Sequence, residues 1–189
     1  MSTGCTPSQT VGPYLHIGLD WLNTTELAAA DVAGERCIIQ GQLSDADGAP
    51  IPDGMIEIWQ ANSFGKYVHA LDQRDLPLEK NFTGFGRTPT DAQGCFRFST
   101  IKPGRVLAAN GVMQAPHILV TIFARGLIKQ LVTRIYFPGD EHDADPVMMH
   151  VPTERRATLI ANAVSEQAGL YVWNVAIGSA QHETVFFEL

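Results

Sequence analysis

The chain has 189 residues, of which 45% are hydrophobic and 17% charged, which predicts one folded domain with a sizeable core and excludes a disordered chain. Its formal net charge of −7 excludes the basic surface that binds nucleic acid or an anionic membrane. No apolar run approaches the ~20 residues that span a bilayer, residues 1–9 lack a secretory signal pattern, and three scattered cysteines predict reduced thiols, so we expect a cytoplasmic protein.

The chain begins with a segment that has little core-forming pattern. Residues 1–22 are rich in Thr, Pro and Gly and predict an extended arm that is ordered by docking onto another surface, whereas residues 23–189 predict a single domain. At the start of that domain, residues 23–26 match a capping box and predict a short helix. A second short helix is predicted over residues 152–165, where apolar residues recur at helical spacing.

Most of the domain has the sequence pattern of β-strands. Runs of β-branched, aromatic and alternating apolar residues are separated by turn sequences that contain Gly, Pro or Asp. We expect strands over residues 37–43, 55–59, 96–98, 117–124, 131–137, 171–177 and 184–187. Several short strands with regular turns predict an all-β fold, a β-sandwich or a barrel, with one or two short helices.

Two acidic stretches are candidates for cation sites. The sequence Asp45-Ala-Asp47-Gly48 starts like a calcium-binding loop, but no Glu follows at the required spacing, so it predicts a hairpin turn. The run from Asp140 to Asp145 is interpreted as a solvated loop without a function. The six histidines form no zinc-binding motif.

The segment Pro116-His117-Ile118-Leu119 resembles one half of a His-x-His metal site. Side chains two apart on a strand point to the same face, but Leu119 has no lone pair to offer. Taken alone, Tyr67 and His117 are more often packing residues than metal ligands. Arg125, at the end of a predicted strand, is either part of a surface ion pair or a site that recognises a carboxylate through paired hydrogen bonds.

Longer strings resemble the intradiol ring-cleaving dioxygenases, and in particular the alpha chains of members built from two kinds of chain. These strings lie at residues 6–18, 56–61, 84–88, 102–104, 115–118, 123–126, 133–137 and 183–187. Their order and spacing are more specific than any one of them. The resemblance implies a β-sandwich of the intradiol dioxygenase type with an extended N-terminal arm.

The resemblance also implies where the iron belongs. In this family ferric iron is held by two tyrosines and two histidines of the beta chain, and phenolate oxygens suit that hard ion. On this chain the four positions are Tyr67, Val106, His117 and Leu119, of which two have no donor atom. We therefore expect that this chain holds no metal and no catalytic residue, and that a homologous beta chain binds Fe(III) in alpha–beta pairs of a larger assembly.

For the alpha chain, the resemblance implies contact with the substrate, a small catecholic acid that reacts with O2. The implied substrate-binding positions are Thr10, Gly12, Pro13, Tyr14 and Arg125. A Gly-Pro bend allows close backbone approach, and a tyrosine ring supplies a rigid wall. Arg125 would attract the ring carboxylate, which the net charge of −7 otherwise repels. The arm over residues 1–22 would dock on the beta chain.

Two alternatives remain open at the level of sequence. One is a self-sufficient metalloenzyme that uses some of Tyr14, Tyr67, His16, His69 and His117 in a rearranged site. The other is a β-sandwich binding module that has lost catalysis. Iron analysis of the isolated chain separates the first alternative from the alpha-chain hypothesis, and the absence of a ferric partner would favour the second.

Overall fold

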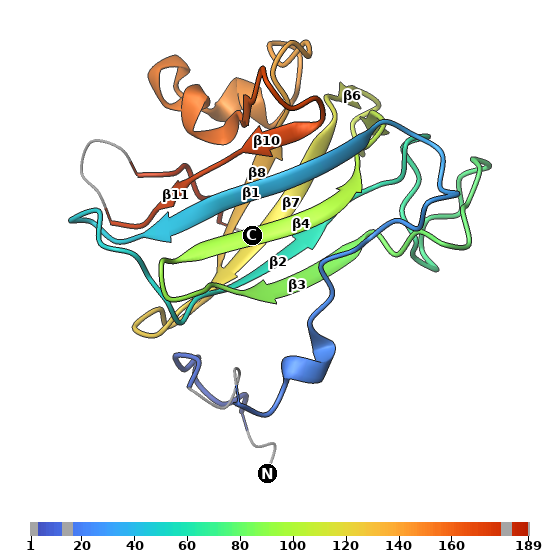
Figure 1. Ribbon diagram of the computed structural model, residues 1–189. Helices are drawn as coiled ribbons and strands as arrows, with labels where there is room; N and C mark the ends of the chain where they lie inside the picture. The colour runs from blue at the N-terminus through green and yellow to red at the C-terminus, as the bar shows by residue number, and fades with distance from the viewer. Residues whose placement is uncertain (1–3, 13–16, 179–182, 189) are drawn as a thin grey trace.

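Two packed β-sheets make up the body of the protein (Figure 1), which confirms the predicted all-β class. The computed structural model describes residues 4–12, 17–178 and 183–188. Their strands are β1 (Arg36–Ser44), β2 (Met55–Trp59), β3 (Phe85–Pro89), β4 (Cys95–Ile101), β5 (Val106–Leu107), β6 (Met113–Gln114), β7 (His117–Phe123), β8 (Leu131–Tyr136), β9 (Asn162–Ala163), β10 (Leu170–Val172) and β11 (Val175–Ala176). Their helices are short 3-10 turns: η1 (Asp20–Leu22), η2 (Met148–His150) and η3 (Thr153–Leu159). In these residues no helix has the length and apolar character needed to cross a membrane.

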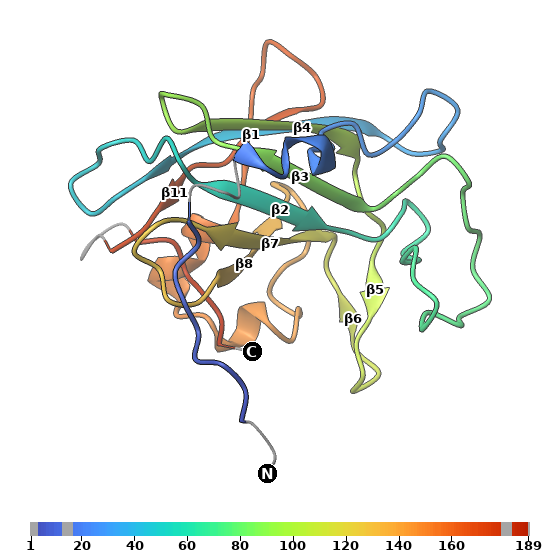
Figure 2. The ribbon, with the colours of Figure 1, turned by 90° about the horizontal axis from the view of Figure 1, so that it is seen from below.

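The two sheets differ in how their strands run. In the first, β1 pairs antiparallel with β4 on one side and parallel with β10 and β11 on the other, and β9 extends the sheet beyond β10. The second sheet has the order β3-β2-β7-β8, with every neighbouring pair antiparallel. Figure 2 shows β1 and β4 in one layer, β2 and β7 in the other, and the β5–β6 ribbon projecting from the body.

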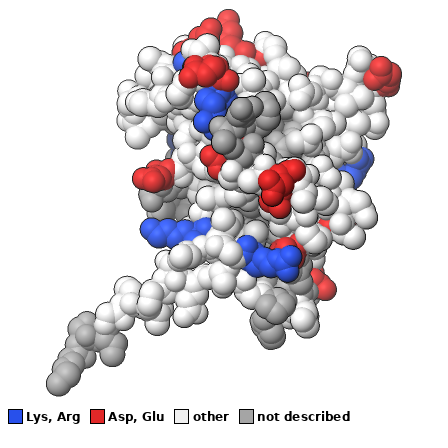
Figure 3. All heavy atoms as spheres, turned by 90° about the vertical axis from the view of Figure 1, so that its left-hand side faces the viewer, with Lys and Arg blue, Asp and Glu red and all other residues white. Residues whose placement is uncertain are grey.

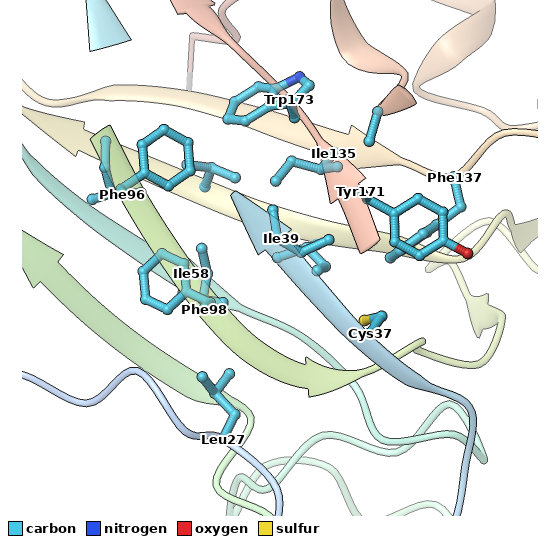
Figure 4. Close-up of a cluster of buried hydrophobic side chains, with 14 of the residues drawn as sticks. Leu27, Cys37, Ile39, Ile58, Phe96, Phe98, Ile135, Phe137, Tyr171 and Trp173 are labelled. Atoms are coloured by element: carbon cyan, nitrogen blue, oxygen red, sulfur yellow. The ribbon is translucent and has the colours of Figure 1, made fainter. Parts of the chain in front are cut away.

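The core lies between the sheets and is built from the inward-facing residues of their strands. Figure 4 shows Ile39 and Phe98 of the first sheet meeting Ile58 of the second, and all three are at most 1% exposed. Trp173 fills one end of this layer, and its indole N–H donates to the carbonyl of Thr158 at 3.0 Å. The buried indole thus keeps a hydrogen-bond partner, as buried tryptophans usually do.

Strand β7 shows the period-2 alternation that positions the candidate site. Ile118, Val120 and Ile122 face the core and are fully buried. The intervening side chains, which begin with His117 and Leu119, therefore lie on the outer face of the second sheet. That face is also the one from which the β5–β6 ribbon projects (Figure 2).

The helix predicted at residues 23–26 is wrong. The segment is extended, and Thr24 pairs with β3 whereas Glu26 pairs with β4. Leu27, which follows, is 1% exposed in the core. Local capping chemistry is outweighed here because an extended segment pairs with both sheets and buries a leucine between them.

The helix predicted over residues 152–165 is only partly correct. Residues 153–159 form the 3-10 helix η3, but Ile160 forms a parallel bridge with Tyr136 and the chain continues into β9. The helical stripe ends because Leu159 is already fully buried and the next residues extend the sheets. The strand predicted over 171–177 is likewise divided into β10 and β11, and residues 184–187 pair only at single positions with Ala176 and Val132.

Candidate functional site

A tight turn follows β7 and carries Arg125. The amide of Leu127 donates to the carbonyl of Ala124 at 3.2 Å, which places Arg125 and Gly126 at the two central positions. Gly126 has φ 87°, the left-handed value that the third residue of a type II turn requires. Because glycine adopts this φ without strain, the turn projects Arg125 into solvent with 77% of its side chain exposed.

The arm reaches this turn and binds it through one hydrogen bond. The amide of Gly126 donates to the hydroxyl of Thr10 at 2.8 Å. Gln9 and Val11 flank Thr10 and enclose a small cavity of about 80 Å³ against the residues of the β7–β8 connection. Thr10 and Arg125, predicted from positions 115 residues apart, are thus brought to one place.

The remaining substrate-binding predictions lie further along the arm. Gly12 is exposed, and nothing lies within 4 Å of where a Cβ atom would stand, so the structure leaves room beside its backbone. Pro13 and Tyr14 lie outside the described residues. Figure 3 shows the face of the molecule that carries the turn, with basic and acidic side chains interspersed above the extended arm.

Arg125 forms an ion pair with a residue near the start of β2. Its Nε atom lies 3.0 Å from Oδ2 of Asp53, a side chain that is 30% exposed. Asp53 precedes β2, so the pair joins the turn after β7 to the start of a neighbouring strand. Sequence reasoning did not find Asp53, because its partner is distant in the chain and no motif links the two residues.

At the other end of β7, where the strand begins at His117, the side chains are buried, and we call it the closed end. His117 is 4% exposed, and its Nδ1 atom lies 2.8 Å from the carbonyl oxygen of Ala115. A carbonyl only accepts, so Nδ1 carries the proton of the neutral ring and Nε2 keeps its lone pair. Burial, reinforced by the nearby charge of Arg134, lowers the pKa of His117 to about 4. The ring is therefore neutral at pH 7.

The positions that the resemblance assigns to iron ligands, Tyr67, Val106, His117 and Leu119, lie near this end of the strand. Leu119 stands between Trp59 on β2 and Arg134 on β8 in the sheet register. The ring of Tyr67 lies parallel to that of Trp59, with centroids 6.0 Å apart. Tyr67, Trp59 and the buried Val106 line one cavity of about 810 Å³.

The residues at these positions do not fit a ferric ion. Tyr67 and His117 have donor atoms, but Val106 and Leu119 have hydrocarbon side chains that cannot replace a phenolate and an imidazole. Burial raises the pKa of Tyr67, which favours the protonated phenol. Among the described residues no group of three or more His, Cys, Asp and Glu side chains is placed to hold a metal. The rearranged metal site therefore gains no support from Tyr67, His69 and His117, and its remaining candidates, Tyr14 and His16, lie outside the described residues.

A buried polar network supports the closed end, and the sequence did not reveal it. Asp145 is 1% exposed and accepts hydrogen bonds from the amides of Ala115, Val147 and Met148 at 2.8–3.1 Å. The hydroxyl of Tyr136 also donates to it, at 3.1 Å. The interpretation of the 140–145 run as solvated is thus wrong for Asp145. Its position just before the helical turn η2 was the available signal, because Asp commonly accepts hydrogen bonds from the amides that open such turns.

Comparisons with known proteins agree with this picture. A family model described as Dioxygenase matches residues 14–179. The chain is 39% identical to the protocatechuate 3,4-dioxygenase alpha chain of Burkholderia cepacia over 97% of both proteins. It is 43% identical to the beta chain from the same organism, over 68% of this chain and 56% of that one. An intradiol ring-cleavage dioxygenase structure from Tetranychus urticae superposes with a TM-score of 0.64 at 20% identity, covering 86% of this chain and 89% of that one. The chain therefore belongs to the intradiol ring-cleaving dioxygenase family.

Proposed function

We propose that this chain is the alpha subunit of a protocatechuate 3,4-dioxygenase, an oxidoreductase in which a homologous beta chain carries Fe(III). The proposal rests on the difference between the side chains at the two ends of β7. At one end Val106 and Leu119 remove two of the four metal ligands, whereas at the other Thr10 and Gly126 hold the arm beside Arg125. End-to-end similarity to an alpha chain supports the same assignment.

The proposed reaction joins one O2 to 3,4-dihydroxybenzoate. The ring bond between the two hydroxyl-bearing carbons breaks, and both oxygen atoms enter the product, 3-carboxy-cis,cis-muconate. The aromatic ring is thereby oxidised and O2 is reduced, and no further co-reactant is needed. The partner's iron would supply the redox chemistry, so this chain's residues act by binding and orientation.

Arg125 is the residue that we assign to the substrate carboxylate. The guanidinium lies at the surface, and the pair with Asp53 fixes where it stands. A planar guanidinium binds a carboxylate through paired, charge-assisted hydrogen bonds, which are worth about 1.5–3 kcal/mol each. Thr10, Gly12, Pro13 and Tyr14 would form the adjoining wall of the cavity.

We further propose that the arm, residues 1–22, docks on the beta chain and that residues 23–189 form the single sandwich domain. Ile17 and Trp21 support this docking because each is 77% exposed on a segment that extends away from the sandwich (Figure 1). Large apolar side chains at this exposure mark surfaces that a partner covers. The free thiols of Cys5, Cys37 and Cys95 favour a reducing compartment, and we place the enzyme in the cytoplasm.

Co-expression tests the proposal. The chain produced alone is expected to be colourless, iron-poor and inactive towards protocatechuate. Produced together with a homologous chain that retains both tyrosines and the His-x-His pair, it should copurify as a reddish ferric-tyrosinate complex with one iron per pair of chains. Stoichiometric iron in the isolated chain would contradict the assignment, and so would failure of the two chains to associate.

A further inference from the structure

The register of the second sheet places Asp53 opposite Arg125. Met55 of β2 pairs with Phe123 of β7. Asp53 lies two residues before Met55, and Arg125 lies two residues after Phe123, so the antiparallel register carried beyond this last pair sets the two charged residues against each other. The distance of 3.0 Å between Arg125 Nε and Asp53 Oδ2 agrees with this placement. The ion pair is therefore a consequence of the sheet register.

Asp53 is the fixed member of this pair. The next residue, Gly54, donates its amide to the hydroxyl of Thr90 at 2.9 Å and accepts from the amide of Thr90 at 2.9 Å. Thr90 is buried, and a Cβ atom at Gly54 would lie 2.5 Å from a methyl group of Leu43, so the backbone beside Asp53 is anchored against the core. Arg125 is much more exposed than Asp53. The guanidinium is thus the member that adjusts.

A fixed carboxylate beside Arg125 makes this site sensitive to the number of charges on its ligand. In the proposed reaction the substrate carries one carboxylate. Ring cleavage turns the two hydroxyl-bearing carbons into two more, so the product carries three, all of them ionised at neutral pH. Arg125 can hold the first carboxylate of either ligand. The two additional carboxylates of the product are repelled by Asp53, whereas the substrate has no such charges.

We propose that Asp53 is a specificity-determining residue that makes the Arg125 site prefer the monoanionic substrate over the trianionic product, and so limits product inhibition. The inference rests on the proposed function, from which it takes the substrate and the product. Any influence of Asp53 on the orientation of Arg125 is common to both ligands and cancels in the ratio of their inhibition constants. The influence of its charge does not cancel, because it grows with the charge of the ligand.

Competitive inhibition of protocatechuate cleavage by the complex with a beta chain tests the proposal. The inhibitors are 4-hydroxybenzoate, which carries one carboxylate, and 3-carboxy-cis,cis-muconate, which carries three. At pH 7 and an ionic strength of about 0.01 M, where charges act over about 30 Å, Asp53→Asn should lower the Ki of the product relative to that of 4-hydroxybenzoate by about three- to fivefold. In about 1 M salt this shift should vanish. An unchanged ratio, or a shift that salt does not reduce, would overturn the proposal.

Further variants separate the local charge from other effects. Asp53→Ser is a second neutral variant and should shift the ratio as Asp53→Asn does, whereas Asp53→Glu keeps the charge and should keep the ratio. Asp143→Asn is the matched control, because Asp143 is fully exposed and follows β8, whose last residue, Tyr136, pairs with His117 at the closed end. It removes the same charge far from Arg125 and should leave the ratio unchanged. Equal shifts in Asp143→Asn and Asp53→Asn would overturn the local role of Asp53.

Arg125→Ala distinguishes failure of this inference from failure of the proposed function. A complex that does not cleave protocatechuate, or that cleaves it equally well with Arg125→Ala, would contradict the proposed function and the inference with it. A complex that cleaves protocatechuate, is weakened by Arg125→Ala and keeps its inhibition ratio with Asp53→Asn would leave the proposed function standing. In that case only the role of Asp53 would be wrong.

Discussion

The two ends of β7 differ in nearly every physical respect, although about 20 Å of one strand separates them. At the His117 end the side chains are buried, and a network centred on Asp145 satisfies the backbone amides around it. At the Arg125 end a glycine turn carries a charged side chain that is 77% exposed beside an extended arm. The contrast shows that one strand can join a buried, hydrogen-bonded end that supports stability to an exposed, charged end that faces solvent.

The largest effect, a loss of stability, is expected when Asp145 is removed from the polar network at the closed end. Asp145→Ala leaves three backbone amides, two of them buried, and the Tyr136 hydroxyl without their acceptor. We expect the free energy of unfolding to fall by about 3–5 kcal/mol. Chemical denaturation of the purified chain measures this loss. Asp143→Asn is the matched control, since that side chain is fully exposed and its replacement should leave the unfolding midpoint unchanged. Equal effects of the two variants would show that the network is not a source of stability.

A fall in pH should lower the free energy of unfolding, because His117 is buried as a neutral ring in the folded protein. Burial holds the pKa of His117 at about 4 in the folded protein, against 6.5 in the unfolded chain. As the pH falls from 6.5 to 4, the unfolded chain takes up a proton that the folded protein refuses, so stability decreases across this window and the decrease levels off below it. The full contribution is about 3 kcal/mol.

The variant His117→Gln isolates this contribution. Its unfolding free energy should depend less steeply on pH between 6.5 and 4, because the titrating group is gone while an amide can still reach the Ala115 carbonyl. Below pH 4 carboxylates add their own effect, since the pKa of Asp72 is held low mainly by its hydrogen bond with Arg74. An unchanged slope between pH 6.5 and 4 in the variant would mean that another group carries the acid sensitivity.

At the other end of β7, which we call the open end, removal of Arg125 should change substrate specificity and leave the free energy of unfolding nearly unchanged. Arg125→Ala in the complex with a beta chain is expected to lower kcat/KM for protocatechuate by roughly ten- to a hundredfold, the value of one charge-assisted hydrogen bond. Turnover of catechol, which has no ring carboxylate, should change much less, and the ferric absorbance should be unaffected. Equal losses with both substrates would exclude a carboxylate-specific role for Arg125.

The contrast between the two ends was only partly visible in the sequence. Strands such as 55–59 and 117–124 were predictable because β-branched and aromatic residues together make up most of each run and turns bound them, and the observed β2 and β7 agree closely. The extended course of residues 23–26 was not, because it depends on pairing with two strands that lie far along the chain. Hydrogen bonds between residues far apart in the sequence were not predictable for the same reason. The bond between Arg134 and Gln114 forms only when the β5–β6 ribbon lies beside β8.

The smallest effect is expected from Thr10, and it tests whether the arm positions the open end. Thr10→Val keeps the shape of the side chain but removes the acceptor for the Gly126 amide. Because this bond is exposed and neutral, its loss should lower kcat/KM for protocatechuate by only about two- to fivefold in the complex. Thr10→Ser restores the hydroxyl and should restore activity, and Ser8→Ala, on the same exposed arm, should have no effect. If valine and serine behaved alike at position 10, the arm would contribute through its bulk, and the hydrogen bond to the turn would have no part in placing Arg125.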